Sequence, residues 1–237
     1  NYTIYPSGAV NVAARFTSTD MDAAQTEVSE STRTATFTPG RDAARKEASK
    51  LNVPRIGVRF RLPASMNQVE YFGRGPAENY LDRNAGSMVG LYKSTAEELY
   101  FPYVRPQENG HHTDTRWVSL STGKKGLLIQ ADNTIGFNAL RNSIEDFDDE
   151  EATGLSRQWS NFTPEQVANH DEAAAKNVLR RQHHINDITP RDFVEVCVDL
   201  KQQGVAGYDS WGSRPEPAYT LPANREYNWG FTLIPLK

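Results

Sequence analysis

The chain has 237 residues, 38% of them hydrophobic and 10% aromatic, and a formal net charge of -4 at pH 7. That apolar content can build a substantial core, which excludes a disordered chain. The acidic balance gives no basic surface for nucleic acid, and no apolar run approaches the roughly 20 residues that cross a bilayer. We therefore expect a soluble fold with no nucleic-acid or membrane partner.

The chain begins with two predicted strands joined by a turn. Asn1 to Tyr5 and Ala9 to Phe16 flank Pro6-Ser7-Gly8, which is a turn by composition. In the second strand apolar and polar residues alternate, which is the period of a half-buried strand. Because the strand pattern starts at once and no leader precedes it, we expect a piece cut from a longer protein.

The next segment, Thr19 to Ser49, has few large apolar residues, which predicts a long excursion with a short helix near Arg41 to Lys50. Clear alternation returns at Pro54 to Leu62, with apolar residues on one face and three arginines on the other. The arginine face is interpreted as a solvated or domain-contacting surface, with binding of phosphate or another acidic ligand as the alternative.

Further strands are predicted along the rest of the chain. Gly73-Arg74-Gly75-Pro76 is expected to end a strand that begins at Val69. Gly126 to Ala131 and Ile135 to Leu140 are expected to form a hairpin. The other predicted strands are the one ending at Leu120, Phe193 to Leu200, and Tyr227 to Leu233.

Many short strands and Gly/Pro turns indicate an all-β fold, an antiparallel β-sandwich. The clearest helix start is Thr163-Pro164-Glu165-Gln166, inside a polar stretch. No linker or repeat divides the chain, so residues 1–237 are expected to form a single domain. Cys197 is the only cysteine, which excludes an intrachain disulfide and favours a buried thiol.

A glycine-rich stretch near the C-terminus, Gly204 to Pro215, has the composition of a ligand-facing loop. Its glycines allow positive φ and close approach. Trp211, flanked by Asp209, Ser210 and Arg214, offers a ring face beside polar groups, which is what a sugar needs. The alternative is that Trp211 packs into the core.

Two histidine pairs and an acidic run carry ligand-type side chains. The loop Glu108 to Asp114 has the residue types of a metal site, but its adjacent histidines, His111 and His112, would point to opposite sides of an extended segment. A hydrogen-bonding loop near a ligand is favoured, with a plain turn as the alternative. His183-His184 meets the same objection, and Asp146 to Glu151 lacks the spacing of a calcium loop. The sequence therefore predicts no metal site and no catalytic residue in this chain.

Four motifs follow one another along nearly the whole chain: Pro54 to Gly57, Val69 to Arg83, Tyr103 to Gly110, and Gly204 to Trp211 with its Asp-Ser-Trp. In this order they resemble the C-terminal domain of the large bacterial β-galactosidases of glycoside hydrolase family 2. The resemblance implies a β-supersandwich, also seen in galactose mutarotases, as the last of five domains.

The resemblance also implies a division of roles. In that family two catalytic glutamates lie in a central (β/α)8 barrel that this chain lacks, and they act with retention. The tryptophan matching Trp211 lies at the mouth of the active site and stacks on the aglycone sugar. Asp209 and Ser210 would brace the loop or meet sugar hydroxyls. Weaker candidates for the same rim are Glu108, Asn109 and His111.

No cofactor is expected in this chain, and the resemblance implies that Mg²⁺ and Na⁺ would be held through other domains of the full enzyme. The expected partners are a β-galactoside or its aglycone sugar, the remaining domains, and further copies of the full-length enzyme. The compartment stays open between the bacterial cytoplasm and periplasm.

Two features depart from the family pattern. Tyr208 stands where the family's Gly-Gly-Asp-Asp-Ser-Trp has its first Asp, which leaves the loop's hydrogen bonds and preferred aglycone open. The stretch from about Asp148 to Asn177 reads as an insertion, expected to form a helical excursion at the rim of the site or a subunit contact.

The leading hypothesis is therefore a domain that completes the aglycone side of a β-galactosidase active site and stabilises the enzyme assembly, without hydrolytic activity of its own. The alternative is a stand-alone carbohydrate-binding module that binds through Trp211. A mutarotase is a third hypothesis, which rests on fold analogy alone.

Overall fold

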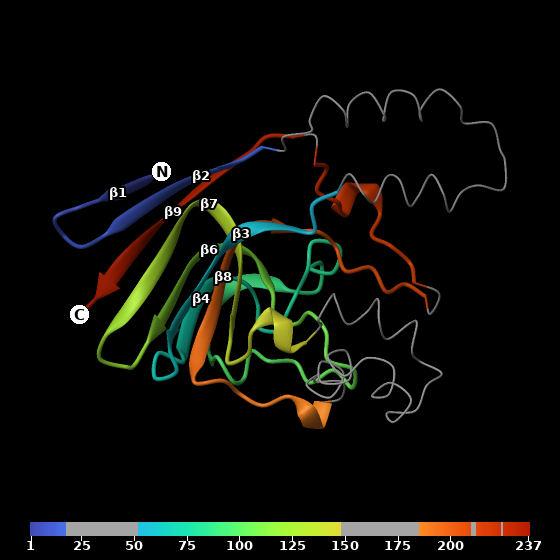
Figure 1. The fold of residues 1–237 in the computed structure, drawn as a ribbon, viewed down its shortest axis with the longest axis horizontal. Helices are drawn as coiled ribbons and strands as arrows, with labels where there is room; N and C mark the ends of the chain where they lie inside the picture. The colour runs from blue at the N-terminus through green and yellow to red at the C-terminus, as the bar shows by residue number, and fades with distance from the viewer. Residues whose placement is uncertain (18–51, 148–184, 210–211, 224) are drawn as a thin grey trace, which may run out of the picture.

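The computed structural model describes residues 1–17, 52–147, 185–209, 212–223 and 225–237 (Figure 1). Within these ranges the chain is built from β-strands and short 3₁₀ helices. The strands are β1 (Tyr2–Ile4), β2 (Val10–Phe16), β3 (Arg55–Pro63), β4 (Gln68–Gly75), β5 (Met88–Thr95), β6 (His112–Ser121), β7 (Gly126–Leu140), β8 (Phe193–Gln202) and β9 (Tyr227–Leu236). The 3₁₀ helices are η2 (Ile144–Asp146), η3 (Ile185–Asp187) and η4 (Pro217–Tyr219).

The strands form one antiparallel sheet in the order β1-β2-β9-β7-β6-β4-β5, with β8 pairing with β7 and β3 pairing with β8. The all-β, antiparallel class predicted from the sequence is confirmed. The predicted N-terminal hairpin is also confirmed, since β1 and β2 pair across a turn in which Gly8 has a φ of 84°.

The sheet divides at β7, the longest strand. Residues 126–131 of β7 pair with β9, whereas residues 136–140 pair with β8 on the same edge. In Figure 1, β1, β2 and β9 extend to one side of the molecule, away from β3 and β8. The hairpin predicted within this segment is wrong, because Asp132-Asn133-Thr134 continues the strand, whose two halves pair with β9 and with β8.

The sheet curves around one apolar cluster, as the layers of a sandwich do. Phe137 of β7 lies at 0% exposure and belongs to this cluster, which also includes side chains of β2, β4, β6, β8 and β9. The ring of Tyr71 meets Phe137 edge to face at 5.0 Å between centroids. Removing this surface from water, at about 25 cal/mol per Å², is the main force that holds the strands together.

Strand β4 runs further than the sequence predicts. It continues through Gly73 and Gly75, which pair with β5. A Cβ on Gly73 would lie 2.4 Å from Thr115 Oγ1, so glycine lets β4 and β6 approach closely here. The glycines therefore permit packing within the strand instead of ending it.

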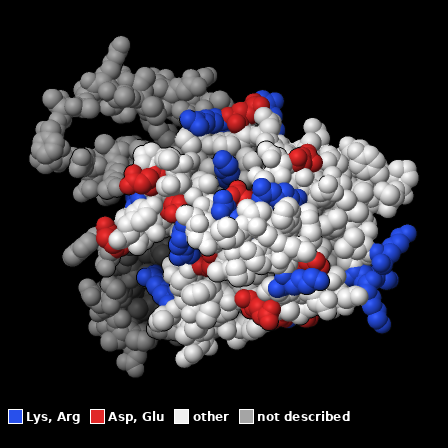
Figure 2. Space-filling model, turned by 180° about the vertical axis from the view of Figure 1, so that it is seen from behind, with Lys and Arg blue, Asp and Glu red and all other residues white. Residues whose placement is uncertain are grey.

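The arginine stripe of β3 pairs with acidic residues of β8. Arg61 lies opposite Glu195 in the register, and its Nε is 3.0 Å from that carboxylate. The predicted alternation of β3 is confirmed, because Ile56 is buried while Arg59 is exposed. Figure 2 shows acidic and basic side chains interspersed over one face of the molecule.

Several expectations fall on residues outside the described ranges. These are the excursion at 19–49, the helical insertion at 148–177, the histidine pair at 183–184, and Ser210 and Trp211. The single-domain organisation stays a prediction. Among the described residues, no helix is long and apolar enough to span a membrane.

Candidate functional site

The loop 204–209 is held by the carboxylate of Asp82. Its Oδ1 accepts the Val205 N–H at 3.1 Å, and its Oδ2 accepts the Ala206 N–H at 2.8 Å. Gly204 is buried beneath the loop, where a Cβ would lie 2.5 Å from Asp82 Cγ. Glycine is therefore required for this contact.

The sequence places Asp82 in a two-residue turn with a rigid base. Tyr80 and Arg83 form an isolated antiparallel bridge, with Arg83 N–H donating to Tyr80 O at 2.8 Å. Tyr80 is 1% exposed and so fixes the turn to the interior. A carboxylate on such a turn faces the loop with little freedom to move.

Glu78 braces the same turn from the other side. Its Oε1 accepts hydrogen bonds from Arg83 Nη2 at 2.7 Å and from the Tyr103 hydroxyl. Its Oε2 accepts the Gly110 N–H at 2.6 Å. Residues of the Val69–Arg83 motif and of the Tyr103–Gly110 motif therefore meet on one carboxylate.

His111 links this turn to a buried polar network. Its ring stacks on Tyr80, with 5.6 Å between centroids and 25° between planes. Its Nδ1 lies 2.8 Å from Asn138 Oδ1, so Nδ1 carries the proton and donates. Asn138 Nδ2 in turn donates to Glu108 Oε1 at 3.2 Å and to Asn109 O at 2.7 Å.

The charges of the network centre on Arg55. Its Nε and Nη2 donate to Asp199 Oδ2 at 2.8 and 2.6 Å, and its Nη1 lies 3.6 Å from Glu108. Burial raises the pKa of Asp199 and of Glu108, and the guanidinium opposes both shifts. Burial acts to lower the pKa of Arg55, but Asp199 and Glu108 outweigh it and raise that pKa.

The buried histidines are neutral at pH 7. Burial lowers the pKa of His111 to about 3, and the charge of Arg55 acts in the same direction. Burial also lowers the pKa of His112, which packs on Phe137 with 5.1 Å between ring centroids. Their roles in the fold are packing and hydrogen bonding.

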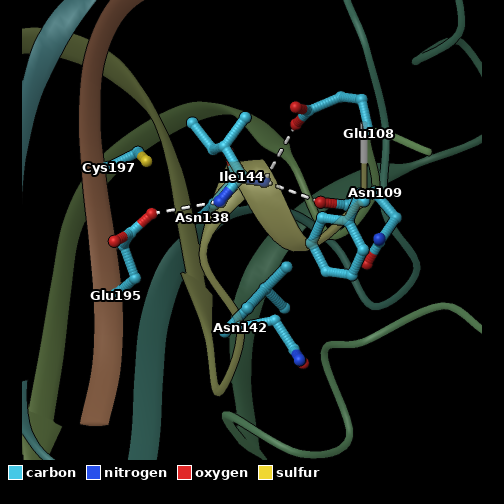
Figure 3. Close-up of a pocket in the computed structure, with 9 residues that line it drawn as sticks. Glu108, Asn109, Asn138, Asn142, Ile144, Glu195 and Cys197 are labelled. Carbon is cyan, nitrogen blue, oxygen red and sulfur yellow. Dashed lines mark hydrogen bonds between the residues drawn. The ribbon is translucent and has the colours of Figure 1, made fainter. Parts of the chain in front are cut away.

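A small pocket opens beside the network, between η2 and β8. Figure 3 shows Asn138 between Glu108 and Asn109, with Cys197 and Glu195 on the facing strand. Glu195 accepts the Ile144 N–H at 3.2 Å, which closes one side of the pocket. The Cys197 thiol is buried as predicted, and burial raises its pKa to about 12.

The described candidate residues differ in how far they are exposed to solvent. Asp209 and Tyr208 are exposed on the loop. Asn109 and His111 are each 2% exposed, and Asn109 is bonded to the Phe101 N–H and to Gln107 O. The Glu108 side chain keeps 27% exposure, so of the weaker candidates it is the one that reaches solvent. The described residues hold no cluster of three or more potential metal ligands.

Comparisons with known proteins bear on the whole chain. The family model described as the β-galactosidase small chain matches residues 1–233. The chain belongs to this family.

The family's curated relatives carry the name β-galactosidase. A protein of Priestia megaterium is 35% identical over 185 residues, which cover 78% of this chain but 15% of the relative. One from Arthrobacter is 40% identical over 44% of this chain and 11% of the relative. One from Vibrio cholerae is 29% identical over 76% of this chain and 14% of the relative. The chain thus spans a small part of the length of the proteins it matches.

Sequence reasoning missed Asp82, Glu78 and Asn138 as supports of the site. Asp82 and Glu78 lie in the Val69–Arg83 motif, which points to this segment but does not reveal the roles of the two side chains. Asn138 lies in a strand pattern and carries no local signal at all. Its role depends on β7 passing beside the loop that holds Glu108 and His111.

Proposed function

We propose that this chain is the C-terminal domain of a β-galactosidase-like glycoside hydrolase, where it completes the aglycone side of the active site. Membership of the small-chain family supports this, as do relatives named β-galactosidase. The catalytic pair of carboxylates, one nucleophile and one acid/base, would be supplied elsewhere in the enzyme, acting with retention. The substrate is a β-galactoside.

The observation that carries the proposal is the loop pinned on Asp82. A loop whose base is fixed by two hydrogen bonds can present its tip with little entropic cost on binding. Asp209 is exposed at that tip, and Ser210 and Trp211 follow it in sequence. Trp211 is proposed as the stacking platform, with Asp209 and Ser210 bracing it or bonding sugar hydroxyls.

The buried network has a supporting role in this proposal. Glu108 is the rim group that can reach a sugar hydroxyl, since part of its side chain is exposed. Asn109 and His111 hold the rim segment in place, His111 through Asn138.

The second part of the proposal is that the domain stabilises the enzyme assembly. Apolar side chains are exposed on the two outermost strands of the sheet order, Ile4 on β1 at 76% and Met88 on β5 at 71%. Exposed apolar residues at sheet edges are typical of surfaces that contact another protein surface. The remaining domains and further copies of the enzyme are the proposed partners.

The test is steady-state kinetics of the natural gene product that carries this chain. We expect Trp211→Ala to lower kcat/KM for lactose by about tenfold, the value of one aromatic contact, and Trp211→Phe to keep most of it. Tyr5→Ala, an exposed aromatic outside the loop, is the control. Unchanged kcat/KM for lactose in Trp211→Ala would contradict the proposal. Sugar binding without hydrolysis would favour a stand-alone carbohydrate-binding module.

A further inference from the structure

Tyr208 presents an aromatic ring that is both exposed and held. Tyr208 is 58% exposed. Its hydroxyl donates to Asp82 Oδ2 at 3.3 Å, and its backbone N–H donates to Ser213 Oγ at 3.0 Å. The ring is therefore fixed at its far end and at its base while a face stays open.

The backbone before Tyr208 has left-handed geometry. Ala206 has a φ of 55° and Gly207 a φ of 85°, two successive left-handed residues that reverse the chain. A Cβ on Gly207 would meet no atom within 4 Å, so the loop is open around it. The strained Ala206 is held by its own N–H bond to Asp82.

Asp82 accepts hydrogen bonds both from the loop backbone and from the Tyr208 side chain. Its carboxylate accepts from the N–H groups of Val205 and Ala206 and from the phenol of Tyr208. An Asp at position 208 would bring a second carboxylate toward Asp82, where like charges repel. Tyrosine at this position instead gives Asp82 a donor and gives the loop a ring.

We propose that Tyr208 is a specificity-determining residue that stacks on the aglycone ring of a β-linked disaccharide, and that Asp82 is the residue that positions it. This inference rests on the proposed function, because the same loop carries Trp211. A hexose aglycone has a C–H face for the ring and hydroxyls for the exposed Asp209 beside it. An aglycone without such a face gains nothing from Tyr208.

Calorimetry on the natural gene product separates the aglycone contribution. The probes are lactose with sulfur in place of its glycosidic oxygen, which resists hydrolysis, and free galactose. We expect Tyr208→Ala to raise the Kd for thiolactose by about threefold to tenfold, the range of one aromatic contact, with the Kd for galactose unchanged. Tyr208→Phe keeps the ring and should stay within about twofold of the parent.

Asp82 is tested through Tyr208. Asp82→Asn should weaken thiolactose binding in the parent, but should add little in a Tyr208→Ala background, since its effect on the aglycone acts through the ring. A purely structural role would weaken both probes equally in both backgrounds. Urea unfolding midpoints of each variant identify loss of fold, and Tyr5→Ala is the matched control for an exposed tyrosine.

The outcomes distinguish a failure of the inference about Tyr208 from a failure of the proposed function. If Trp211→Ala weakens thiolactose binding and Tyr208→Ala does not, the inference is overturned while the proposed function stands. If the parent binds thiolactose no better than galactose, and Trp211→Ala changes neither Kd, both are overturned.

Discussion

The rings of Tyr80 and His111 stack with 5.6 Å between centroids, and both side chains are almost wholly buried. Tyr80 begins the turn that carries Asp82, and His111 is bonded to the Asn138 network. The stack therefore connects the interior of the sheet to the anchor of the exposed loop. Substitutions at either ring should therefore alter the position of the loop 204–209.

His111 should make stability depend on pH. The pKa of His111 is about 3 in the folded chain, against an ordinary value of 6.5. Below about pH 6.5 the unfolded state therefore binds a proton at His111 that the folded state does not bind. His111 therefore does not change the free energy of unfolding above about pH 6.5. As the pH drops toward 3, it lowers that free energy by up to about 1.4 kcal/mol per pH unit. Urea unfolding between pH 7 and 5.5 measures this slope. His111→Gln should make this slope shallower, while His112, whose pKa burial also lowers, continues to contribute to it. An equal slope in the variant would contradict the assignment.

The buried ion pair of Arg55 and Asp199 should be costly to break. Arg55→Ala leaves the carboxylate of Asp199, 2% exposed, without its partner. We expect a loss of about 3–5 kcal/mol in the free energy of unfolding. Arg15→Ala, which removes the exposed pair with Glu226, is the control and should leave that free energy nearly unchanged. Similar losses in the two variants would contradict the buried role.

Gly204 should not tolerate a side chain. The Cβ of Gly204→Ala would overlap the Asp82 carboxylate, so either the loop moves or the turn does. We expect a loss of about 1–3 kcal/mol in the free energy of unfolding, together with weaker binding of thiolactose. At Gly86 an added Cβ meets nothing within 4 Å, so Gly86→Ala should stay within about 0.5 kcal/mol. A Gly204→Ala variant as stable as the parent would show that the loop is not pinned as described.

The fold class could be predicted because alternation reports directly on which face is buried. Ile56 and Val196 follow that rule, and both are buried. The rule fails at Asp199 and Glu195, which occupy the polar side of β8 but are 1% and 3% exposed. Alternation predicts water on that side, whereas Arg55 lies against Asp199, and Arg59, Arg61 and the Ile144 N–H lie against Glu195. Burial of a polar face depends on contacts between distant segments, which a local pattern cannot contain.

Of the candidate site, composition could predict the glycine-rich loop but not the residue that anchors it. The glycines and polar residues around Trp211 predict a loop that contains Asp209, and Asp209 is exposed, while its role in sugar binding stays a prediction. Tyr208 stands out in the sequence only as a departure from the family's Gly-Gly-Asp-Asp-Ser-Trp. Asp82 had no such mark, since its role depends on a turn that meets the loop across more than a hundred residues of sequence. The hairpin expected within β7 failed because the choice between turning and continuing was made by β8 and β9, not by Asp132 to Thr134.

The most direct test of the account is to read the open reading frame upstream of Asn1 in the source DNA. We expect a long in-frame extension that encodes a barrel with two candidate catalytic glutamates, which would supply the chemistry that this domain completes. A start codon immediately before Asn1 would contradict it, because the chain would then bind sugar, if at all, without a catalytic partner in the same polypeptide.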